Sequence, residues 1–224
     1  MTGDQKHCDL SAVPLFPLPN IVLFPRAVLP LHIFEDRYLA MTADALAGDR
    51  RIAMALLKPG WEKSYYGRAA IEPVVCVGKI LSHEKLPDGK YNFLLEGRLR
   101  ARIVREHGEL PYRVAELEAI DLTDVQEIDL VDDRVRLTGF FSQEIFEPVP
   151  GISQLQQLLA SPLSTAGVAD LLAFNLIEDA AFKQSLLADG DVRRRVNRIV
   201  SAIEGLCPVI EAMARRRSRT QSLN

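Results

Sequence analysis

The pattern of apolar and polar positions in this 224-residue chain changes near Asp121. Before this point, short apolar runs are separated by proline and glycine, which is typical of strands joined by turns. After it, apolar residues recur every three or four positions, as in amphipathic helices. We therefore expect a β-rich part over residues 13–122 and an α-helical part over residues 123–214. Residues 1–12 are expected to be disordered, and residues 215–224 to form a basic, flexible tail.

The segment from Val13 to Leu31 holds five of the 13 prolines. Each proline removes a backbone donor and fixes φ, so the segment is expected to form neither a helix nor a central strand. Short edge strands and extended turns, held by buried apolar side chains, are the structures that remain. Phe34 to Gly48 then carries apolar residues at helical spacing and ends in glycine, which predicts an amphipathic helix.

A hairpin turn is predicted at residues 86–90, LPDGK, where proline presets φ and glycine takes the position of positive φ. Strand regions over Pro73–His83 and Tyr91–Val104 flank this turn. In the second region apolar and polar residues alternate, and Gly97 interrupts the alternation, which predicts a bulge or a sharp bend. Two further strands are predicted over Ile52–Leu57 and Tyr112–Ile120.

The second part is predicted to contain helices over Asp132–Phe146, Ser153–Leu159 and Asp179–Leu187. It is also predicted to contain a helix through Leu176 that Ser164 or Thr165 caps, and a last helix capped by Asp191. Apolar residues of the last helix follow alternating spacings of four and three: Val192, Val196, Ile199, Ile203, Leu206, Ile210 and Met213. This seam is expected to pack within the chain's own bundle rather than in a coiled-coil dimer, because the heptads are few and Pro208 interrupts them.

Composition is that of an ordinary globular protein, with 48% hydrophobic and 25% charged residues. The net charge is −3, but residues 193–219 hold eight arginines and two glutamates. This basic end is either a solvated helix face with a tail or a contact for acidic partners. The three cysteines form no CxxC pair, which indicates a reducing compartment. Without an apolar signal segment or a long apolar run, a cytoplasmic protein that does not enter the membrane is expected.

Motifs for catalysis are missing from the sequence. The four histidines form neither an HxH nor an HExxH pattern, and no GxSxG or GxxxxGK[ST] segment occurs. We therefore expect no catalytic, metal or cofactor-binding residues and no enzymatic activity, and keep a hydrolase with a dispersed site as a remote alternative.

Two clusters are candidate binding sites. Trp61, Tyr65 and Tyr66 lie between two predicted strands, and could form a peptide-binding lip or fold back as a lid on the core. Arg98, Arg100 and Arg102 alternate along a predicted strand, and could follow phosphates or an acidic peptide, or pair with Glu116 and Glu118 on the next strand.

The order of four sequence blocks resembles the N-terminal domain family of Lon proteases. These blocks are LFPLPNIVLFPRAVLPLHIFEDRYLAM (15–41), EKLPDGKYNFLLEGRLRARI (84–103), PYRVAELE (111–118), and the pair ADLLAFNL (169–176) and FKQSLLADGDVRRRVNRIV (182–200). Two departures are visible. Arg26 stands where the family usually has glycine, and VVCVGKI fits the strand before the hairpin loosely.

The resemblance implies an α+β fold, in which a twisted six-stranded β pseudo-barrel of the PUA-like kind, with one helix, precedes an α-helical bundle. It also implies a non-catalytic module that recognises protein substrates, and the ATPase and protease domains of Lon lie C-terminal to this region. Expected partners are unfolded or specific client proteins and a protease. Nucleic acid is the alternative partner, through the strand arginines and the basic end, because PUA-like folds often bind it, although fold alone does not decide function.

Overall fold

The structure, a computed structural model, describes residues 9–108, 110–146 and 151–206. Contacts divide the chain into two compact units. The first unit comprises residues 1–121 together with 179–188, and the second comprises residues 122–178 and 189–224. The division after residue 121 lies beside the boundary expected at 122, but residues 179–188 group with the β-rich unit, although they follow most of the helical part in sequence.

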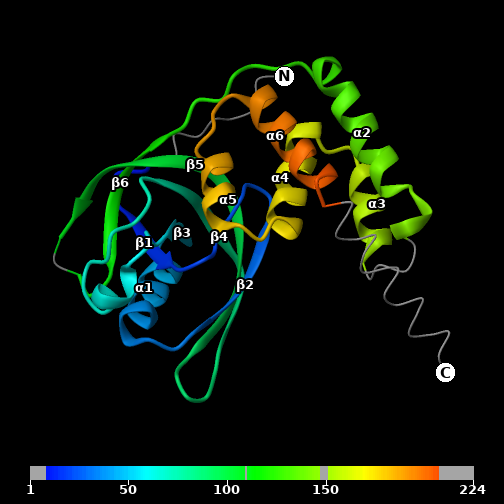
Figure 1. Ribbon diagram of the computed structural model, residues 1–224. Helices are drawn as coiled ribbons and strands as arrows, with labels where there is room; N and C mark the ends of the chain where they lie inside the picture. Colours follow the sequence, from blue (N-terminus) through cyan, green and yellow to red (C-terminus); the bar gives the residue numbers. More distant parts are fainter. Residues whose placement is uncertain (1–8, 109, 147–150, 207–224) are drawn as a thin grey trace. The chain divides into compact units, whose positions relative to one another are not determined.

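The first unit is built around six strands (Figure 1). Its elements are β1 (Val13–Leu18), β2 (Val28–Ile33), α1 (Asp36–Ala47), β3 (Arg51–Leu56), the short 3-10 helix η1 (Trp61–Ser64), β4 (Val74–Lys85), β5 (Tyr91–His107), β6 (Arg113–Ala119) and α5 (Ala180–Leu187).

The strands form a sheet that closes on itself. Their order is β2-β5-β4-β3-β1-β6, and a further pairing of β5 with β6 closes a ring of five strands, with β2 attached to β5 outside it. Only β1 and β3 pair in parallel. Alanine, valine and leucine side chains fill this narrow ring: Val13, Leu15, Ala53, Ala55, Val75, Val77, Ala101, Ala115 and Leu117. The expected six-stranded pseudo-barrel is confirmed.

The proline-rich strand β1 lies inside the sheet rather than at its edge, which corrects the expectation from its composition. Its residues 13–15 pair with β6, and its residues 15–18 pair with β3. Only Leu15 has a partner on both sides, so Pro14 and Pro17 each face one neighbouring strand in the register. Proline lacks the N–H that a strand paired along both sides would need. The staggered pairing of β1 therefore tolerates proline inside the sheet.

The bulge expected at Gly97 is present. Val77 pairs with Leu99 and Gly78 pairs with Gly97, so Arg98 is the extra residue on β5. The same glycine lies against the segment before β2. Its N–H donates to the Ala27 carbonyl at 2.9 Å, and its carbonyl accepts from the Arg26 N–H at 2.8 Å. A side chain at Gly97 would collide with the backbone of this segment.

Arg26 has a φ of 71°, which is the left-handed region that favours glycine. Arginine in place of the family's usual glycine therefore puts strain on the backbone at this position. Its side chain is exposed, and no ion pair of Arg26 occurs among the described residues.

We predict that Arg26→Gly raises the free energy of unfolding by about 1 kcal/mol, the cost of a left-handed non-glycine residue less the entropy that glycine adds to the unfolded chain. Urea denaturation measures this change. Arg26→Ala is the control, because it removes the side chain but keeps Cβ, and an equal gain in that variant would contradict the explanation.

The remaining local predictions for the first unit are close to the structure. Gly89 of the hairpin turn has a φ of 85°, and the Leu86 N–H donates to the Lys90 carbonyl across the turn. The tip of the β4–β5 hairpin extends beyond the ring in Figure 1. Helix α1 buries Tyr38, Met41, Thr42 and Ala45 on one face.

Helix α5 packs against β4, beside which it lies in Figure 1. The Gln184 side chain is buried, and its Nε2 donates to the Val74 carbonyl at 2.8 Å. Asp179 caps the helix by accepting from the Phe182 N–H at 3.0 Å. A helix that is distant in sequence thereby becomes part of the β-rich unit.

The second unit is helical. Its elements are η2 (Glu127–Leu130), α2 (Val131–Phe141), η3 (Glu144–Phe146), α3 (Ile152–Ala160), α4 (Thr165–Leu176) and α6 (Val192–Glu204). The single helix expected over 132–146 ends at Phe141, and η3 follows it after a short interruption. Asp191 caps α6 as expected, and Ser164, one of the two residues expected to cap α4, does so. Ile210, Met213, Pro208 and the basic tail lie outside the described residues.

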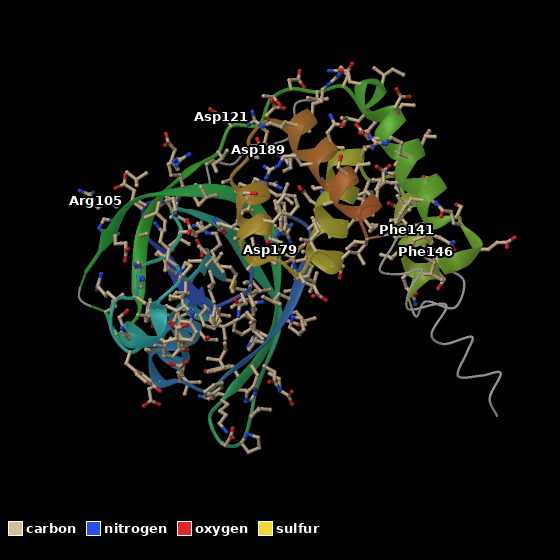
Figure 2. The ribbon with its side chains drawn as sticks, viewed as in Figure 1. Arg105, Asp121, Phe141, Phe146, Asp179 and Asp189 are labelled. Carbon is tan, nitrogen blue, oxygen red and sulfur yellow. The ribbon has the colours of Figure 1, made fainter. Side chains whose placement is uncertain are left out.

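Apolar side chains from four helices form the core of this unit. The α6 residues Val192, Val196, Ile199 and Ile203 are all buried, which confirms that part of the predicted seam. Phe140, Phe141 and Phe146 form an aromatic cluster with ring centroids 4.8–5.5 Å apart; Figure 2 labels the last two. Charged residues also lie inside: Arg195 is 1% exposed and Asp170 is 4% exposed, and Arg195 Nε donates to Asp170 Oδ1 at 3.2 Å.

Candidate functional site

A groove of about 660 Å³ lies in the first unit between α5 and the segments beside β3 and β4. One side is lined by residues of α5 and its flanks: Asp179, Ala180, Ala181, Gln184, Ser185 and Ala188. The other side is lined by Asn20, Leu56, Leu57, Pro59, Gly60, Trp61, Glu62, Glu72, Pro73 and Val74. We call this the Trp61 groove. Its volume lies in the range of about 300–1,000 Å³ that is typical of ligand pockets.

Trp61 reaches this groove because of the turn before it. Gly60 adopts a φ of 85°, and η1 begins at the next residue. The Trp61 ring lies 5.3 Å from the Tyr65 ring in an edge-to-face arrangement, and Tyr65 lies 5.3 Å from Tyr66 in the same way. Tyr65 therefore lies between the other two aromatic residues noted in the sequence and contacts both. The environments of the three residues, however, differ.

Tyr65 is fixed to the start of α1. Its hydroxyl donates to Glu35 Oε1 at 2.5 Å, and its carbonyl accepts from Arg37 Nη1 at 2.9 Å. The Arg37 guanidinium lies 4.8 Å from the Tyr65 ring centroid. Burial raises the pKa of the Tyr65 hydroxyl, and the bond to Glu35 raises it further. These contacts fix the Tyr65 ring, against which the Trp61 and Tyr66 rings pack.

Tyr66 and Trp61 present surface to solvent. Tyr66 is 90% exposed, and Trp61 is partly exposed at the groove. The segment therefore combines the two alternatives from the sequence, since Tyr65 folds back on the protein while Tyr66 projects outward. Exposed or partly exposed Trp and Tyr rings on a supported loop are the side chains most often found at binding hot spots.

The groove carries acidic side chains. Glu62, Glu72 and Asp179 line it, whereas no lysine or arginine does in the part of the chain that the structure describes. Sequence reasoning did not select these carboxylates or helix α5. Asp179 was assigned to the start of a helix, but no local pattern indicates that this helix packs on β4, where Gln184 bonds to Val74 across 110 residues of sequence.

The three strand arginines do not form one exposed stripe. Arg98 is the bulged residue, is exposed and forms an ion pair with Glu96. Arg100 is 4% exposed, and its guanidinium lies 5.8 Å from the Phe24 ring centroid. Arg102 is exposed and lies opposite Glu118 in the sheet. The bulge removes Arg98 from the register that Arg100 and Arg102 share, and burial beside Phe24 separates Arg100 from the exposed Arg102.

The arginines at the start of α6 are paired with aspartates. Arg193 contacts Asp129 at 3.1 Å, and Arg194 contacts Asp189 at 2.6 Å. The hydrogen bonds from Arg194 hold the pKa of the Asp189 carboxyl below its usual value. Arg195 is buried, and Arg198 also contacts Asp189. These pairs favour a solvated helix face for this part of the basic end; Arg215–Arg219 lie outside the described residues.

A second, smaller cavity of about 60 Å³ lies beside α1 and is built from paired groups. Arg113 donates to both carboxylate oxygens of Glu106, at 2.8 and 2.5 Å, and its Nη1 donates to the Ala69 carbonyl. The Tyr112 hydroxyl donates to Asp44 at 2.6 Å; burial and this bond raise its pKa to about 12. The bond between Tyr112 and Asp44 joins α1 to the segment before β6, so we interpret this cavity as part of a structural contact.

Histidines and acidic residues are scattered over the fold. Within the described ranges, no group of three or more histidine, cysteine, aspartate or glutamate side chains is placed to hold a metal ion. His32 contacts Asn92, with 2.7 Å between Nδ1 and Oδ1. None of the described helices is both long and apolar enough to cross a membrane.

Comparison with protein families matches residues 12–205 to the substrate-binding domain of ATP-dependent protease La (Lon). The Lon protease of Xanthomonas oryzae is 27% identical over 97% of this chain, which spans 26% of that protein. Lon protease 2 of Myxococcus xanthus is 26% identical over 86% of this chain, which spans 23% of it. The chain thus spans about a quarter of the length of these curated relatives.

Solved structures show the same fold. The Lon N-terminal domain protein of Xanthomonas campestris has a TM-score of 0.62 and 23% identity, and the match covers 85% of this chain and 98% of that one. The N-terminal domain of a Mycobacterium avium complex Lon protease has a TM-score of 0.61 and 17% identity, over 87% and 98% of the two chains. The fold expected from the sequence resemblance is therefore confirmed.

Proposed function

This chain belongs to the family of Lon substrate-binding domains, and we propose that it binds extended segments of client proteins and catalyses no reaction itself. The Trp61 groove is the observation that carries this proposal. It is a concave surface, with an aromatic residue and apolar side chains at one side and a helix at the other. Such surfaces bind peptides by filling pockets with alternate side chains.

The aromatic side chains supply affinity in this proposal. Trp61 and Tyr66 offer rings that can be buried by a ligand, whereas Tyr65 is already held by Glu35 and Arg37. Burying a large aromatic ring contributes most to binding where the ring is held in place before the ligand arrives. The contacts of Tyr65 limit the motion of the segment that carries both rings.

A protease is the partner that this role calls for. The family is defined by substrate binding, and its curated relatives are proteases of which this chain matches only one part. We propose that segments bound by this chain are delivered to such an enzyme. The paired and buried arginines described above supply no observation that favours nucleic acid as the ligand.

The direct test is the binding of a labelled, permanently unfolded protein such as reduced casein, measured by fluorescence anisotropy. We expect Trp61→Ala to weaken binding about tenfold or more and Tyr66→Ala to weaken it less, because Trp61 lines the groove. Tyr65 is left unchanged, since its removal would disturb the contact with α1.

Phe34→Ala is the matched control, because Phe34 is a 60% exposed aromatic residue that does not line the groove. Its affinity should equal that of the original protein. Equal binding by the Trp61→Ala variant and the original protein would remove the groove from the proposal. A loss of similar size in the Phe34→Ala variant would show that exposed aromatic residues bind without selectivity.

A further inference from the structure

We infer that the Trp61 groove selects client segments that carry lysine or arginine beside apolar residues, an inference that rests on the peptide-binding function proposed above. The groove combines an aromatic ring with carboxylates and lacks cationic side chains among the described residues that line it. Nothing in the family description specifies the charge of the substrate. The preference comes from the side chains that this chain places there.

The carboxylates come from three separate segments of the first unit. Glu62 lies on η1, Glu72 precedes β4, and Asp179 precedes α5 (Figure 2 labels Asp179). Glu62 and Asp179 are exposed, and Glu72 is partly buried. Across the described ranges, none of the three forms an ion pair with a lysine, arginine or histidine. Elsewhere in this unit, many carboxylates have such partners, as Glu106 has Arg113 and Glu96 has Arg98.

Uncompensated carboxylates on different walls of one groove produce a negative potential inside it. A concave surface with apolar walls strengthens this potential, because it limits the access of water and counter-ions. A lysine or arginine side chain that enters would gain several weak attractions at once. An acidic side chain would be repelled by the carboxylate on each wall. The charge of the groove would therefore favour basic segments and exclude acidic ones.

The partial positive charge at the start of α5 opposes this preference. The N-terminus of a helix carries a partial positive charge, which favours anions. Here the Asp179 carboxylate already accepts a hydrogen bond from the Phe182 N–H, so a full negative charge lies over the partial positive one. The helix is also short, at eight residues. The Asp179 charge therefore offsets the partial positive charge of the helix start.

The remaining walls suit the stem of a basic side chain. Leu56, Leu57, Pro59 and Pro73 offer apolar surface. On the α5 side, Ala180, Ala181 and Ala188 have small side chains that leave room for a ligand. Lysine and arginine bury their methylene stems against such surfaces while the charged end stays near carboxylates or water. The Trp61 ring can also attract the cation through its face. These features favour basic, partly apolar segments over uniformly charged ones.

The test uses three labelled peptides of equal length that share their leucine and phenylalanine positions and carry lysine, serine or glutamate at all the others. The full chain is titrated against each at low and moderate salt. We expect the lysine peptide to bind about tenfold more tightly than the serine peptide at low salt, from several weak surface attractions acting together. The glutamate peptide should bind most weakly. Added salt should reduce the difference.

The charge preference is then removed by Glu62→Gln, Glu72→Gln and Asp179→Asn together. Asparagine keeps the capping ability of residue 179, so α5 should remain intact. We expect the lysine peptide to fall to the affinity of the serine peptide, while binding of the serine peptide is unchanged. The control carries Glu84→Gln, Glu118→Gln and Asp121→Asn, exposed acidic residues that do not line the groove. It changes the net charge equally and should keep the preference.

Several outcomes would overturn this inference. They are equal affinities of the lysine and serine peptides for the original protein, equal loss of preference in the control, or preference retained in the groove variant. In each of these cases, serine-peptide binding that depends on Trp61 would leave the proposed function intact. Absence of binding to all three peptides would overturn both. Sedimentation that shows self-association, lost in the groove variant, would identify a second copy of the chain as the occupant and would also overturn the inference.

Discussion

Gly97→Ala is expected to lower the free energy of unfolding of the β-rich unit by about 3 kcal/mol or more, the upper range for overpacked positions. A Cβ at this position would lie 2.1 Å from the Phe24 carbonyl oxygen and 2.8 Å from the carbonyl carbon. Both are backbone atoms, so a side-chain rotation cannot relieve the collision. The Gly97 backbone also makes hydrogen bonds to Arg26 and Ala27, and separating the two segments would break them.

Two other glycines provide a graded comparison. At Gly78 an added Cβ would meet Leu95 Cγ at 2.7 Å and the Glu96 carbonyl oxygen at 3.1 Å, so its backbone contact is looser than at Gly97 and Gly78→Ala should cost less. Around Gly108 nothing lies within 4 Å, and Gly108→Ala should be close to neutral. Chemical denaturation, followed by fluorescence of Trp61 in the same unit, measures all three. A Gly97→Ala variant as stable as Gly108→Ala would show that the two segments are not packed as the structure has them.

Arg195→Met is expected to destabilise the helical unit by about 3–5 kcal/mol, the usual cost of removing one partner of a buried ion pair. Arg195 is 1% exposed and its partner Asp170 is 4% exposed. The guanidinium donates to Asp170 Oδ1 at 3.2 Å and to the Asp189 carbonyl at 2.7 Å. Methionine fills similar space but leaves the Asp170 charge in a buried site without its cation.

The double variant Arg195→Met, Asp170→Leu separates this charge effect from a packing effect. It removes both charges, and it should recover much of the lost stability. Arg193→Met serves as the control, because Arg193 and Asp129 form an exposed pair and its loss should cost less than about 1 kcal/mol. Circular dichroism during denaturation follows the helical signal. A double variant no more stable than Arg195→Met would mean that the buried charge is not the cause.

The local elements were predictable from the sequence, because each depends on neighbouring residues. The LPDGK turn, the Gly97 bulge and the caps at Ser164 and Asp191 follow from the conformations that these residue types favour. Features that depend on distant partners were not predictable in this way. Proline in β1 was read as an edge signal, and only the staggered pairing with β3 and β6 explains its place inside the sheet.

The candidate site shows the same limit. Trp61 was selected because a lone tryptophan beside glycine in a loop is a local signal. The opposite wall belongs to α5, whose ordinary helical pattern gives no sign that Gln184 bonds to Val74. Arg100 was assigned to an exposed stripe because it alternates with Arg102, but the structure buries it beside Phe24, which is distant in sequence.

The return of residues 179–188 to the β-rich unit has a consequence for the order of events during synthesis. The ribosome releases all six strands well before α5, so the sheet can close while Val74 still lacks the bond from Gln184. Domains commonly fold as they emerge, N-terminal parts first. The wall of the groove that α5 provides is then the last piece added to this unit, after the chain has already passed through α2, α3 and α4. A nascent chain arrested before residue 179 should therefore hold a folded sheet with an open groove.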